Sequence, residues 1–282
     1  MKKGLVLEGG AMRGMFTVGV IDVMMEHDVN YDGLIGVSAG AAFGCNYKSR
    51  QIQRALRYNK MLASDPRYMG IRSFLKTGNY ISDWFTYHVV PYAYDIFDTV
   101  TFRSNPMAYY LVCTDVHTGE PVYKRLDEVD HSTLEWIRAS ASMPMLSKPV
   151  ALEGRELLDG GISNSIPLEY FQKIGYERNV VVLTQPLGFV KQRTKLMPLF
   201  KTLMRKYPAI VDAMARRHEM YNRQLEYLRQ EEKKGNTLLI YPLEKLPISR
   251  VESKPEKLQE IYDMGRKVGE QRIQDVISFL ND

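Results

Sequence analysis

The sequence predicts an α/β sandwich in which helices cover both faces of a mostly parallel central sheet. Strand-like and helix-like segments alternate along the 282 residues, starting with a strand at 2–10 that ends in glycines. The later segments NVVVLTQP (179–186) and NTLLIYP (236–242) are almost continuously apolar, which is typical of strands covered on both faces. Hydrophobic residues make up 45% and charged residues 25% of the chain, an ordinary composition for a globular protein with a sizeable core.

The N-terminal part of the chain contains two predicted strand–helix pairs and a third helix. Helical spacing at 15–27 follows the first strand, and an apolar strand at 32–37 precedes a helix of small residues at 39–47. A further helical pattern covers 51–62. Residues 65–106 are aromatic-rich and irregular, so no element is predicted there.

The middle of the chain contains two predicted hairpins with a helix between them. The hairpins cover 107–126 and 149–161, and the helix covers 132–140. This helix opens with Ser132 and Glu135, which have the spacing of a capping box.

The C-terminal part of the chain is predicted to be largely helical. A short helix at 165–175 precedes the first apolar strand, a basic helical segment at 188–234 separates the two apolar strands, and a long helix covers about 255–280. No repeat or linker interrupts the chain, so we expect 1–282 to form one domain, with the chemistry-bearing motifs within about 1–185.

Cysteine content and hydropathy bear on the compartment. Two cysteines, Cys45 and Cys113, are too few for a disulfide framework, which favours a reducing, cytoplasmic setting. The N-terminus lacks a signal-peptide pattern, and no run approaches the ~18 apolar residues of a membrane span. We therefore expect a cytoplasmic protein that contacts a membrane only peripherally, if at all.

The stretch GVSAG has the G-x-S-x-G pattern of a nucleophile elbow, with Ser38 between Gly36 and Gly40. An apolar strand precedes it and a small-residue helix follows it, which is the context that a nucleophilic serine needs. Glycines two residues away on either side allow a crowded turn to expose the serine. The alternative interpretation is a tight strand–helix turn in which Ser38 only caps the helix.

Three residues are candidates for the base that accepts the proton of Ser38. Asp159 ends a strand before two glycines, and Asp115 ends another strand. His218 would complete a Ser–Asp–His order, but it lies in a charged helical stretch that is typical of a solvated surface. The position of Ser38 after a single strand also differs from ordinary α/β-hydrolases, which have several strands before the elbow.

A glycine turn in EGGAMRG (8–14) follows the first strand and has two possible uses. It matches a dinucleotide-binding fingerprint imperfectly, with Asp32 or a neighbour as the ribose-binding acid. Its consecutive backbone N–H groups also suit an oxyanion hole, which explains Ser38 as well as the glycines.

The ordered motifs EGGAMRG, GVSAG and DGG resemble the patatin-like phospholipases, as does ASASMPML between the second and third motifs. The resemblance covers about residues 1–185 and implies a patatin-like α/β fold. It implies a Ser–Asp dyad in place of a triad, and no cofactor or metal. The implied roles are nucleophile for Ser38, base for Asp159, oxyanion hole for Gly9, Gly10 and Ala11, and support for Arg13, Gly36, Gly40, Gly160 and Gly161. Ala11 replaces a glycine common in the family, and a positive φ there would be strained.

These motifs predict a serine lipid acyl hydrolase, of phospholipase A or carboxylesterase type, that works through an acyl-enzyme. Two alternatives remain open. One is an acyltransferase or thioesterase with the same dyad, and the other is a non-enzymatic nucleotide- or lipid-binding protein that keeps the glycine loop.

The basic charge is concentrated in one segment. Residues 188–234 hold 12 Lys or Arg against 5 Asp or Glu, although the whole chain is only +5. Within 188–206, apolar residues fall on one helical face beside an acid-free basic rim. This pattern suits either a lid or interfacial helix on anionic lipid or a helix packed on its own domain. No nucleic-acid-binding motif accompanies the charge, so no nucleic-acid partner is expected.

Overall fold

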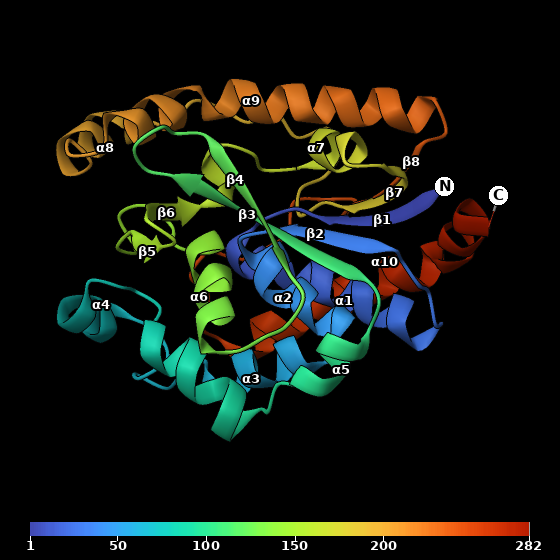
Figure 1. The fold of residues 1–282 in the computed structure, drawn as a ribbon, viewed down its shortest axis with the longest axis horizontal. Coiled ribbons are helices and arrows are strands. Elements are labelled where there is room, and N and C mark those ends of the chain that lie inside the picture. Colours follow the sequence, from blue (N-terminus) through green and yellow to red (C-terminus); the bar gives the residue numbers. More distant parts are fainter. Residues whose placement is uncertain (282) are drawn as a thin grey trace.

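A mostly parallel sheet with helices on both faces forms the centre of the structure, a computed structural model that describes residues 1–281 (Figure 1). The strand order is β5-β6-β3-β2-β1-β7-β8, with β4 paired to β3 on its other edge. The central strands β3, β2, β1, β7 and β8 are parallel, whereas β4, β5 and β6 form antiparallel pairs. The strands are β1 (Lys2–Leu7), β2 (Gly33–Val37), β3 (Ala108–Asp115), β4 (Pro121–Leu126), β5 (Val150–Leu152), β6 (Arg155–Asp159), β7 (Tyr176–Val182) and β8 (Thr237–Ile240).

One face of the sheet is covered by a large helical layer, which lies below the sheet in Figure 1. The N-terminal helix α1 packs along the C-terminal helix α10, and glycines make this contact close: a Cβ on Gly265 would overlap the carbonyl of Phe16. The helices of this layer are α1 (Gly14–Glu26), α2 (Ala39–Lys48), α3 (Arg54–Leu62), α5 (Thr99–Ser104), α6 (His131–Ser140) and α10 (Pro255–Asn281).

The opposite face is covered by α7 (Leu168–Lys173) and the long helix α9 (Pro208–Lys233), seen above the sheet in Figure 1. Apolar residues of α9 such as Leu225 and Leu228 pack there against central strands. The fold class predicted from the alternating elements and continuous apolar strands is therefore confirmed.

The segment at 65–106, for which no element was predicted, contains three short helices. They are α4 (Ile71–Thr77), a π-helix at Phe85–Tyr94 and α5. Pro91 lies inside the π-helix and cannot donate a backbone hydrogen bond. Short and irregular helices of this kind lack the regular apolar spacing on which sequence prediction depends.

The predicted cap of α6 is wrong in its residues. Asp130, not Ser132, is the N-cap, and its carboxylate accepts hydrogen bonds from the backbone N–H groups of Ser132 and Thr133. The Thr133 hydroxyl oxygen in turn accepts from the backbone of Asp130, which completes the capping box. Glu135 is thereby left free to pair with side chains outside the turn.

The basic segment forms two helices, because Pro208 begins α9 after a break that follows α8 (Met197–Leu203). Part of the predicted apolar face of 188–206 is packed. Met197, Phe200 and Met204 lie in a buried apolar cluster together with Leu158 and Ile210. Leucines of the same stretch, Leu196, Leu199 and Leu203, remain exposed.

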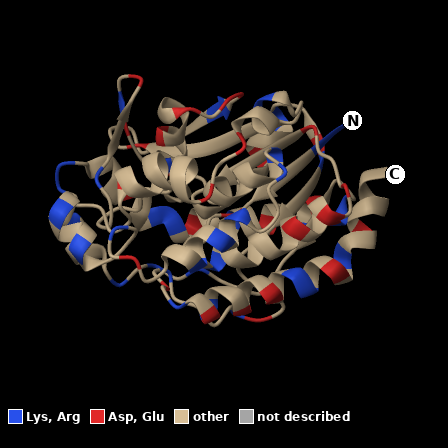
Figure 2. Cartoon of the chain, turned by 90° about the horizontal axis from the view of Figure 1, so that it is seen from below, with Lys and Arg blue, Asp and Glu red and all other residues tan. Residues whose placement is uncertain are grey.

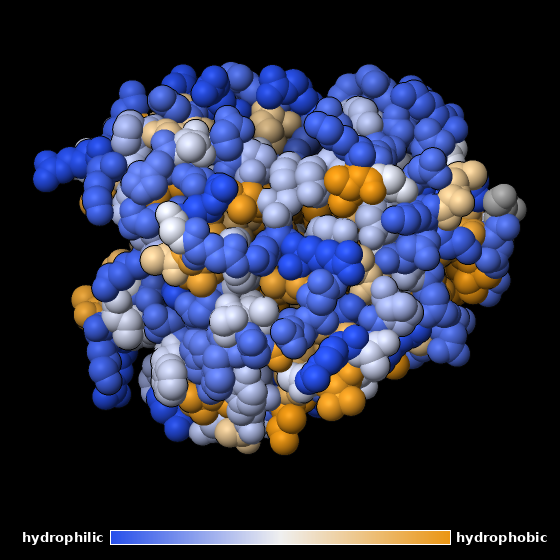
Figure 3. Space-filling view, viewed as in Figure 1, coloured by the Kyte–Doolittle hydropathy of each residue, from blue (hydrophilic) through white to orange (hydrophobic). Residues whose placement is uncertain are grey.

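The surface carries both signs of charge and separated apolar patches. The long helix that ends at the C-terminus shows alternating acidic and basic residues along its outer face (Figure 2). On the face shown in Figure 3, apolar residues form small patches in a largely hydrophilic surface. Among the described residues, no helix is both long enough and apolar enough to span a membrane.

Candidate active site

Two strand ends meet along one edge of β3. β2 runs parallel to β3 and ends at Val37, opposite Val112. β6 runs antiparallel to β3 and ends at Asp159, opposite Cys113. Both strands must lie on the same edge of β3, because β4 pairs with nearly the same stretch of β3 on the other edge. The residue that follows β2, Ser38, therefore faces the last residue of β6.

Ser38 occupies a strained turn between β2 and α2. Its φ of 55° and ψ of −121° are rare for a residue with a side chain and lift the hydroxyl out of the backbone. The turn is crowded, since a Cβ on Gly36 would lie 2.5 Å from the carbonyl oxygen of Gly40. The hydroxyl of Ser140 fixes the turn from α6: it accepts from the N–H of Ser38 at 3.0 Å and donates to the carbonyl of Val112 at 2.6 Å.

The Ser38 hydroxyl donates to Oδ2 of Asp159 at 2.6 Å. The other carboxylate oxygen, Oδ1, accepts from the N–H of Gly161 at 2.8 Å, and the Asp159 N–H donates to the carbonyl of Ser142. Burial raises the pKa of Asp159, and the hydrogen bond from Ser38 and the charge of Arg217 oppose that rise only in part. A raised pKa brings the carboxylate closer to the range in which a general base works near neutral pH.

The two glycines after Asp159 allow close packing of the turn. A Cβ on Gly160 would overlap the carbonyl oxygen of Val112 on β3. The carbonyl of Gly161 accepts a hydrogen bond from Nε of Arg217 on α9. The turn that carries the carboxylate is thus fixed both by the sheet and by a helix from the C-terminal part of the chain.

The glycine loop lies directly beside Ser38. A Cβ on Gly9 would stand 3.0 Å from the Cβ of Ser38, so only glycine permits this approach. In the part of the chain that the structure describes, the backbone N–H groups of Gly9, Gly10 and Ala11 donate to no protein acceptor. Ala11 has a φ of 49°. This is the positive φ that the sequence analysis described as strained, because Ala11 stands where the family often has a glycine.

Glu8 anchors this loop, although the sequence analysis assigned it no role. It is only 1% exposed, and its carboxylate accepts from the backbone N–H of Thr184 and from the hydroxyl of Tyr221, both at 2.6 Å. Arg13 lies nearby, and burial lowers its pKa while the charge of Glu8 opposes that shift. The sequence did contain a signal for this role, since Glu8 is a charged residue at the end of an apolar strand. A carboxylate that is buried there requires hydrogen-bond or ionic partners.

The other candidate bases are held elsewhere. His218 lies 3.8 Å from Glu219 on the same helix and lines neither cavity that reaches Ser38. The Asp115 carboxylate accepts from the backbone N–H groups of His117 and Thr118, so it caps the turn between β3 and β4. Among residues 1–281, no group of three or more His, Cys, Asp or Glu side chains has the arrangement of a metal site.

An apolar cavity of about 110 Å³ extends from Ser38 beneath the 65–106 segment. Its walls are mainly aromatic and aliphatic side chains from that segment and from α3 and α6. They include Tyr58, Met69, Tyr87, Val90, Phe97 and Leu134. A mainly apolar space beside a nucleophile suits the hydrocarbon part of a substrate.

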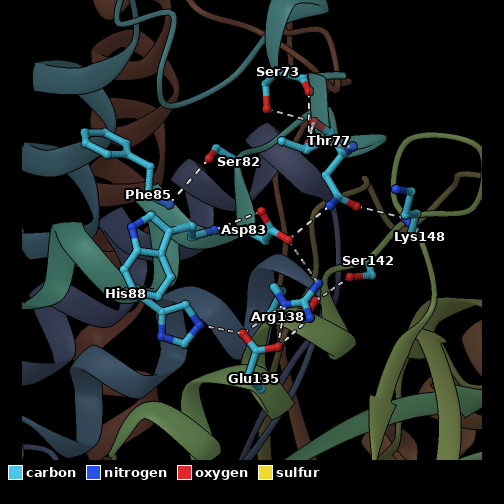
Figure 4. A network of polar contacts seen from close by, with 12 residues as sticks. Ser73, Thr77, Ser82, Asp83, Phe85, His88, Glu135, Arg138, Ser142 and Lys148 are labelled. Carbon is cyan, nitrogen blue, oxygen red and sulfur yellow. Dashed lines mark hydrogen bonds and ion pairs between the residues drawn. The ribbon is translucent and has the colours of Figure 1, made fainter. Parts of the chain in front are cut away.

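A polar network ties the cover of this cavity to α6 (Figure 4). Arg138 lies between Asp83, at 4.0 Å, and Glu135, to which its Nε donates at 2.9 Å. His88 from the π-helix contacts the same Glu135 carboxylate at 2.7 Å. Residues 65–106 are therefore held over the cavity by ionic contacts as well as by apolar packing.

A second cavity, of about 150 Å³, lies on the other side of Ser38 and also reaches Asp159. The first cavity has charged side chains among mainly apolar walls, and Arg250 lines both cavities. Besides Asp159, the walls of the second cavity carry five charged side chains. These are Glu8, Arg13, Lys191, Arg217 and Arg250. The sequence analysis placed a basic segment near these positions but did not bring its side chains to the nucleophile.

Comparison with family models places two known regions in the chain. The model described as "Patatin-like phospholipase" matches residues 5–171, which contain Ser38, Asp159 and the glycine loop. The model described as "Domain of unknown function (DUF6363)" matches residues 207–281, which contain α9 and α10.

Similar proteins occur in bacteria and fungi. "Uncharacterized protein YjjU" of Escherichia coli K12 is 30% identical over 94% of this chain and 75% of its own length. "Uncharacterized NTE family protein Rv1063c" of Mycobacterium tuberculosis is 24% identical over 63% of this chain, and "Lysophospholipase NTE1" of Scheffersomyces stipitis is 28% identical over 68%. The chain spans 48% and 12% of the length of these last two relatives. Among solved structures, VipD from Legionella pneumophila has a TM-score of 0.47 at 13% identity, covering 97% of this chain and 67% of that one.

Proposed function

The chain belongs to the patatin-like phospholipase family, and we propose that it is a lipid hydrolase that acts on ester bonds with a Ser38–Asp159 dyad and a glycine-loop oxyanion hole. The observation that carries the proposal is the 2.6 Å hydrogen bond from the Ser38 hydroxyl to Asp159. No histidine stands between the two groups, so the carboxylate itself is the base.

The reaction proceeds in two halves. As Ser38 Oγ attacks the ester carbonyl, its proton passes to Asp159 and the carbonyl oxygen becomes negative. The free N–H groups of Gly9, Gly10 and Ala11 stabilise this oxyanion, and each such donor is typically worth about 2.7–4 kcal/mol. Asp159 returns the proton to the departing alcohol, which leaves an acyl-enzyme. Water then loses a proton to Asp159 as it attacks the acyl-enzyme. Asp159 passes this proton to Ser38 Oγ as the bond between the serine and the acyl group breaks, which releases the fatty acid and restores the free hydroxyl.

An acyltransferase or thioesterase would use the same residues, and it differs only in the donor and the final acceptor of the acyl group. A non-enzymatic binding protein would need neither the strained conformation of Ser38 nor its bond to Asp159. This strain therefore favours catalysis over binding alone.

The test is hydrolysis of p-nitrophenyl esters of increasing chain length, with Ser38→Ala beside the natural protein. A fluorophosphonate probe should label Ser38 covalently, as located by mass spectrometry. Label at another residue, or no label on active protein, contradicts the assignment of the nucleophile. Thioester substrates and product analysis separate a lipid hydrolase from an acyltransferase or thioesterase.

We also propose peripheral contact with anionic membranes through residues 188–206. Exposed leucines of this stretch, Leu196, Leu199 and Leu203, stand beside basic residues, which is the composition of an interfacial helix. The enzyme would then remove lipid substrates from a surface to which this stretch is bound.

A further inference from the structure

Four cationic side chains line the second cavity together with Ser38 and Asp159. They come from separate parts of the chain: the turn after β1, the loop after β7, helix α9 and the loop after β8. They are Arg13, Lys191, Arg217 and Arg250. The fold therefore gathers positive charge within the space that the nucleophile faces.

The four cations lack carboxylate partners. Within residues 1–281, none of them makes an ion pair within 4 Å. Nε of Arg13 is buried and has no hydrogen-bond partner among the residues that the structure describes. The ammonium of Lys191 lies 4.5 Å from the centre of the Tyr221 ring, and the one hydrogen bond that Arg217 donates within the described part of the chain goes to the carbonyl of Gly161. Each cation is thus available to an anion in the cavity.

The two carboxylates of the cavity are already engaged. Glu8 is bonded by Thr184 and Tyr221, and Asp159 is bonded by Ser38 and Gly161. The cavity therefore offers no free carboxylate to a cationic ligand group such as a quaternary ammonium.

Crowding of like charges makes the empty cavity unfavourable for its cations. Burial, together with the charges of Arg217, Arg250 and Arg13, lowers the pKa of Lys191 to about 7 against the opposing effect of Glu8. Burial likewise lowers the pKa of Arg217. A bound anion would offset both the burial and the mutual repulsion.

We propose that this cavity binds the phosphate of the substrate, so that the preferred lipid is an acyl ester of glycerol phosphate that carries a phosphomonoester. A dianionic phosphate matches several unpaired cations, and guanidinium groups hold phosphate oxygens in pairs of hydrogen bonds. The inference rests on the proposed hydrolase function, since it assigns the head-group side of the same site.

The relation of the two cavities supports this assignment. Both reach Ser38, and they share Ala11, Met143, Leu146 and Arg250 in their walls. Arg250 therefore stands where the two cavities meet, whereas Arg13, Lys191 and Arg217 line only the second. The ester carbonyl would lie at the junction, with the acyl chain in the apolar cavity and the glycerol phosphate in the cationic one. This arrangement fixes the direction in which the lipid enters the site.

The decisive experiment compares three lipids with one acyl chain, each below its critical micelle concentration. They are 1-acylglycerol 3-phosphate, 1-acyl-glycero-3-phosphocholine and 1-acylglycerol. We expect kcat/KM for the phosphomonoester to exceed both others by about 10-fold or more, since charge-assisted hydrogen bonds are the strong ones. Lys191→Gln should reduce this preference by about 10-fold. Lys245→Gln, which removes an equally positive but exposed side chain outside the cavity, should leave it unchanged.

A binding experiment separates the two proposals. Calorimetry on Ser38→Ala, with its fold checked by circular dichroism, should detect glycerol 3-phosphate binding that Lys191→Gln weakens. If all three esters are cleaved at similar rates, the phosphate assignment is overturned and the hydrolase stands. If no ester is cleaved but glycerol 3-phosphate still binds, the hydrolase proposal fails. If inorganic phosphate binds as tightly as glycerol 3-phosphate and the esters show no preference, the site takes free phosphate, which also overturns the head-group assignment.

Discussion

The hydroxyl oxygen of Ser38 lies 2.6 Å from Oδ2 of Asp159, although 121 positions separate the two residues in the sequence. The register of the sheet produces this contact, because β2 and β6 end opposite adjacent residues of β3, Val112 and Cys113. Any change that shifts either strand by one residue would separate the pair, since alternate residues of a strand face opposite sides.

Asp159→Asn should lower kcat by 10²–10⁴-fold, the usual contribution of a general base. The substitution keeps the shape of the side chain and its acceptor for the N–H of Gly161, but it removes the proton acceptor. The measurement is kcat on one water-soluble ester, with circular dichroism to confirm folding.

Two matched variants test whether the carboxylate acts alone. Asp115→Asn and His218→Ala should each leave kcat within about threefold, because neither side chain lines a cavity that reaches Ser38. Members of a triad act as a unit, so loss of a triad histidine would cost nearly as much as loss of the serine. A collapse of activity in correctly folded His218→Ala would therefore exclude the dyad.

The pH profile should reflect the buried carboxylate. Asp159 acts as a base only when it is deprotonated, and burial raises its pKa. We expect kcat/KM on a neutral ester to rise with pH through a value above about 3.9, the ordinary value for aspartate. If kcat/KM instead rises at or below that ordinary value, burial does not determine the pKa of Asp159.

Ala11→Gly should preserve activity and stabilise the protein. Ala11 has a φ of 49°, a conformation that costs a residue with a side chain about 1–2 kcal/mol and glycine much less. We expect the free energy of unfolding to increase by up to about 1 kcal/mol, because the added flexibility of glycine in the unfolded chain offsets part of the gain. Urea denaturation measures this change, and a clear loss of stability would contradict the strain.

Binding to vesicles should depend on charge and on the exposed face of α8. We expect binding to anionic liposomes that weakens with added salt, because surface charges are screened within about 10 Å at 0.1 M. The double variant Leu199→Ser and Leu203→Ser should bind less, whereas Leu243→Ser, at a still more exposed leucine outside this stretch, should not change binding. Equal binding to neutral and anionic vesicles at every salt concentration would reject the electrostatic contribution.

Asp22 should make stability fall between pH 5 and pH 8. Burial raises its pKa from 3.8 to about 7, against hydrogen bonds from Tyr262 and the backbone of Gln53. The folded state therefore holds a proton that the unfolded state releases, so its advantage is present at low pH and lost as pH rises towards 7. Urea denaturation at pH 5 and at pH 8 gives the difference in the free energy of unfolding between the two values. Asp22→Asn should reduce this difference by about 2–3 kcal/mol. Parallel pH dependence in the variant and the natural protein would disprove this role.

The sequence predicted the elements whose pattern is local. The apolar strands, the G-x-S-x-G turn and the helix at the C-terminus each follow from residues that are close in the chain, and the structure contains all of them. The cap of α6 was assigned to Ser132 because the capping-box spacing also fits that residue, whereas Asp130 supplies the stronger acceptor.

Contacts between residues that are distant in the chain could not be predicted from the sequence. Nothing in the segment around Tyr221 indicates that its hydroxyl binds Glu8, 213 positions earlier. Nor does the charge of 188–234 reveal that Lys191 and Arg217 turn inward while other basic residues of the segment remain exposed. Such contacts depend on how α9 lies across the sheet, which no short-range pattern specifies.

The cations of the second cavity also separate two kinds of evolutionary change. Ser38 and Asp159 lie within the region common to patatin-like phospholipases, residues 5–171, whereas Lys191, Arg217 and Arg250 all lie beyond it. Substitutions of Lys191 and Arg250 can therefore alter which lipids are accepted without removing a contact of Ser38 or Asp159, whereas Arg217 also holds the turn that carries Asp159. A lineage could diversify its substrates by drift in the loops that carry Lys191 and Arg250, and the chemistry would be inherited unchanged.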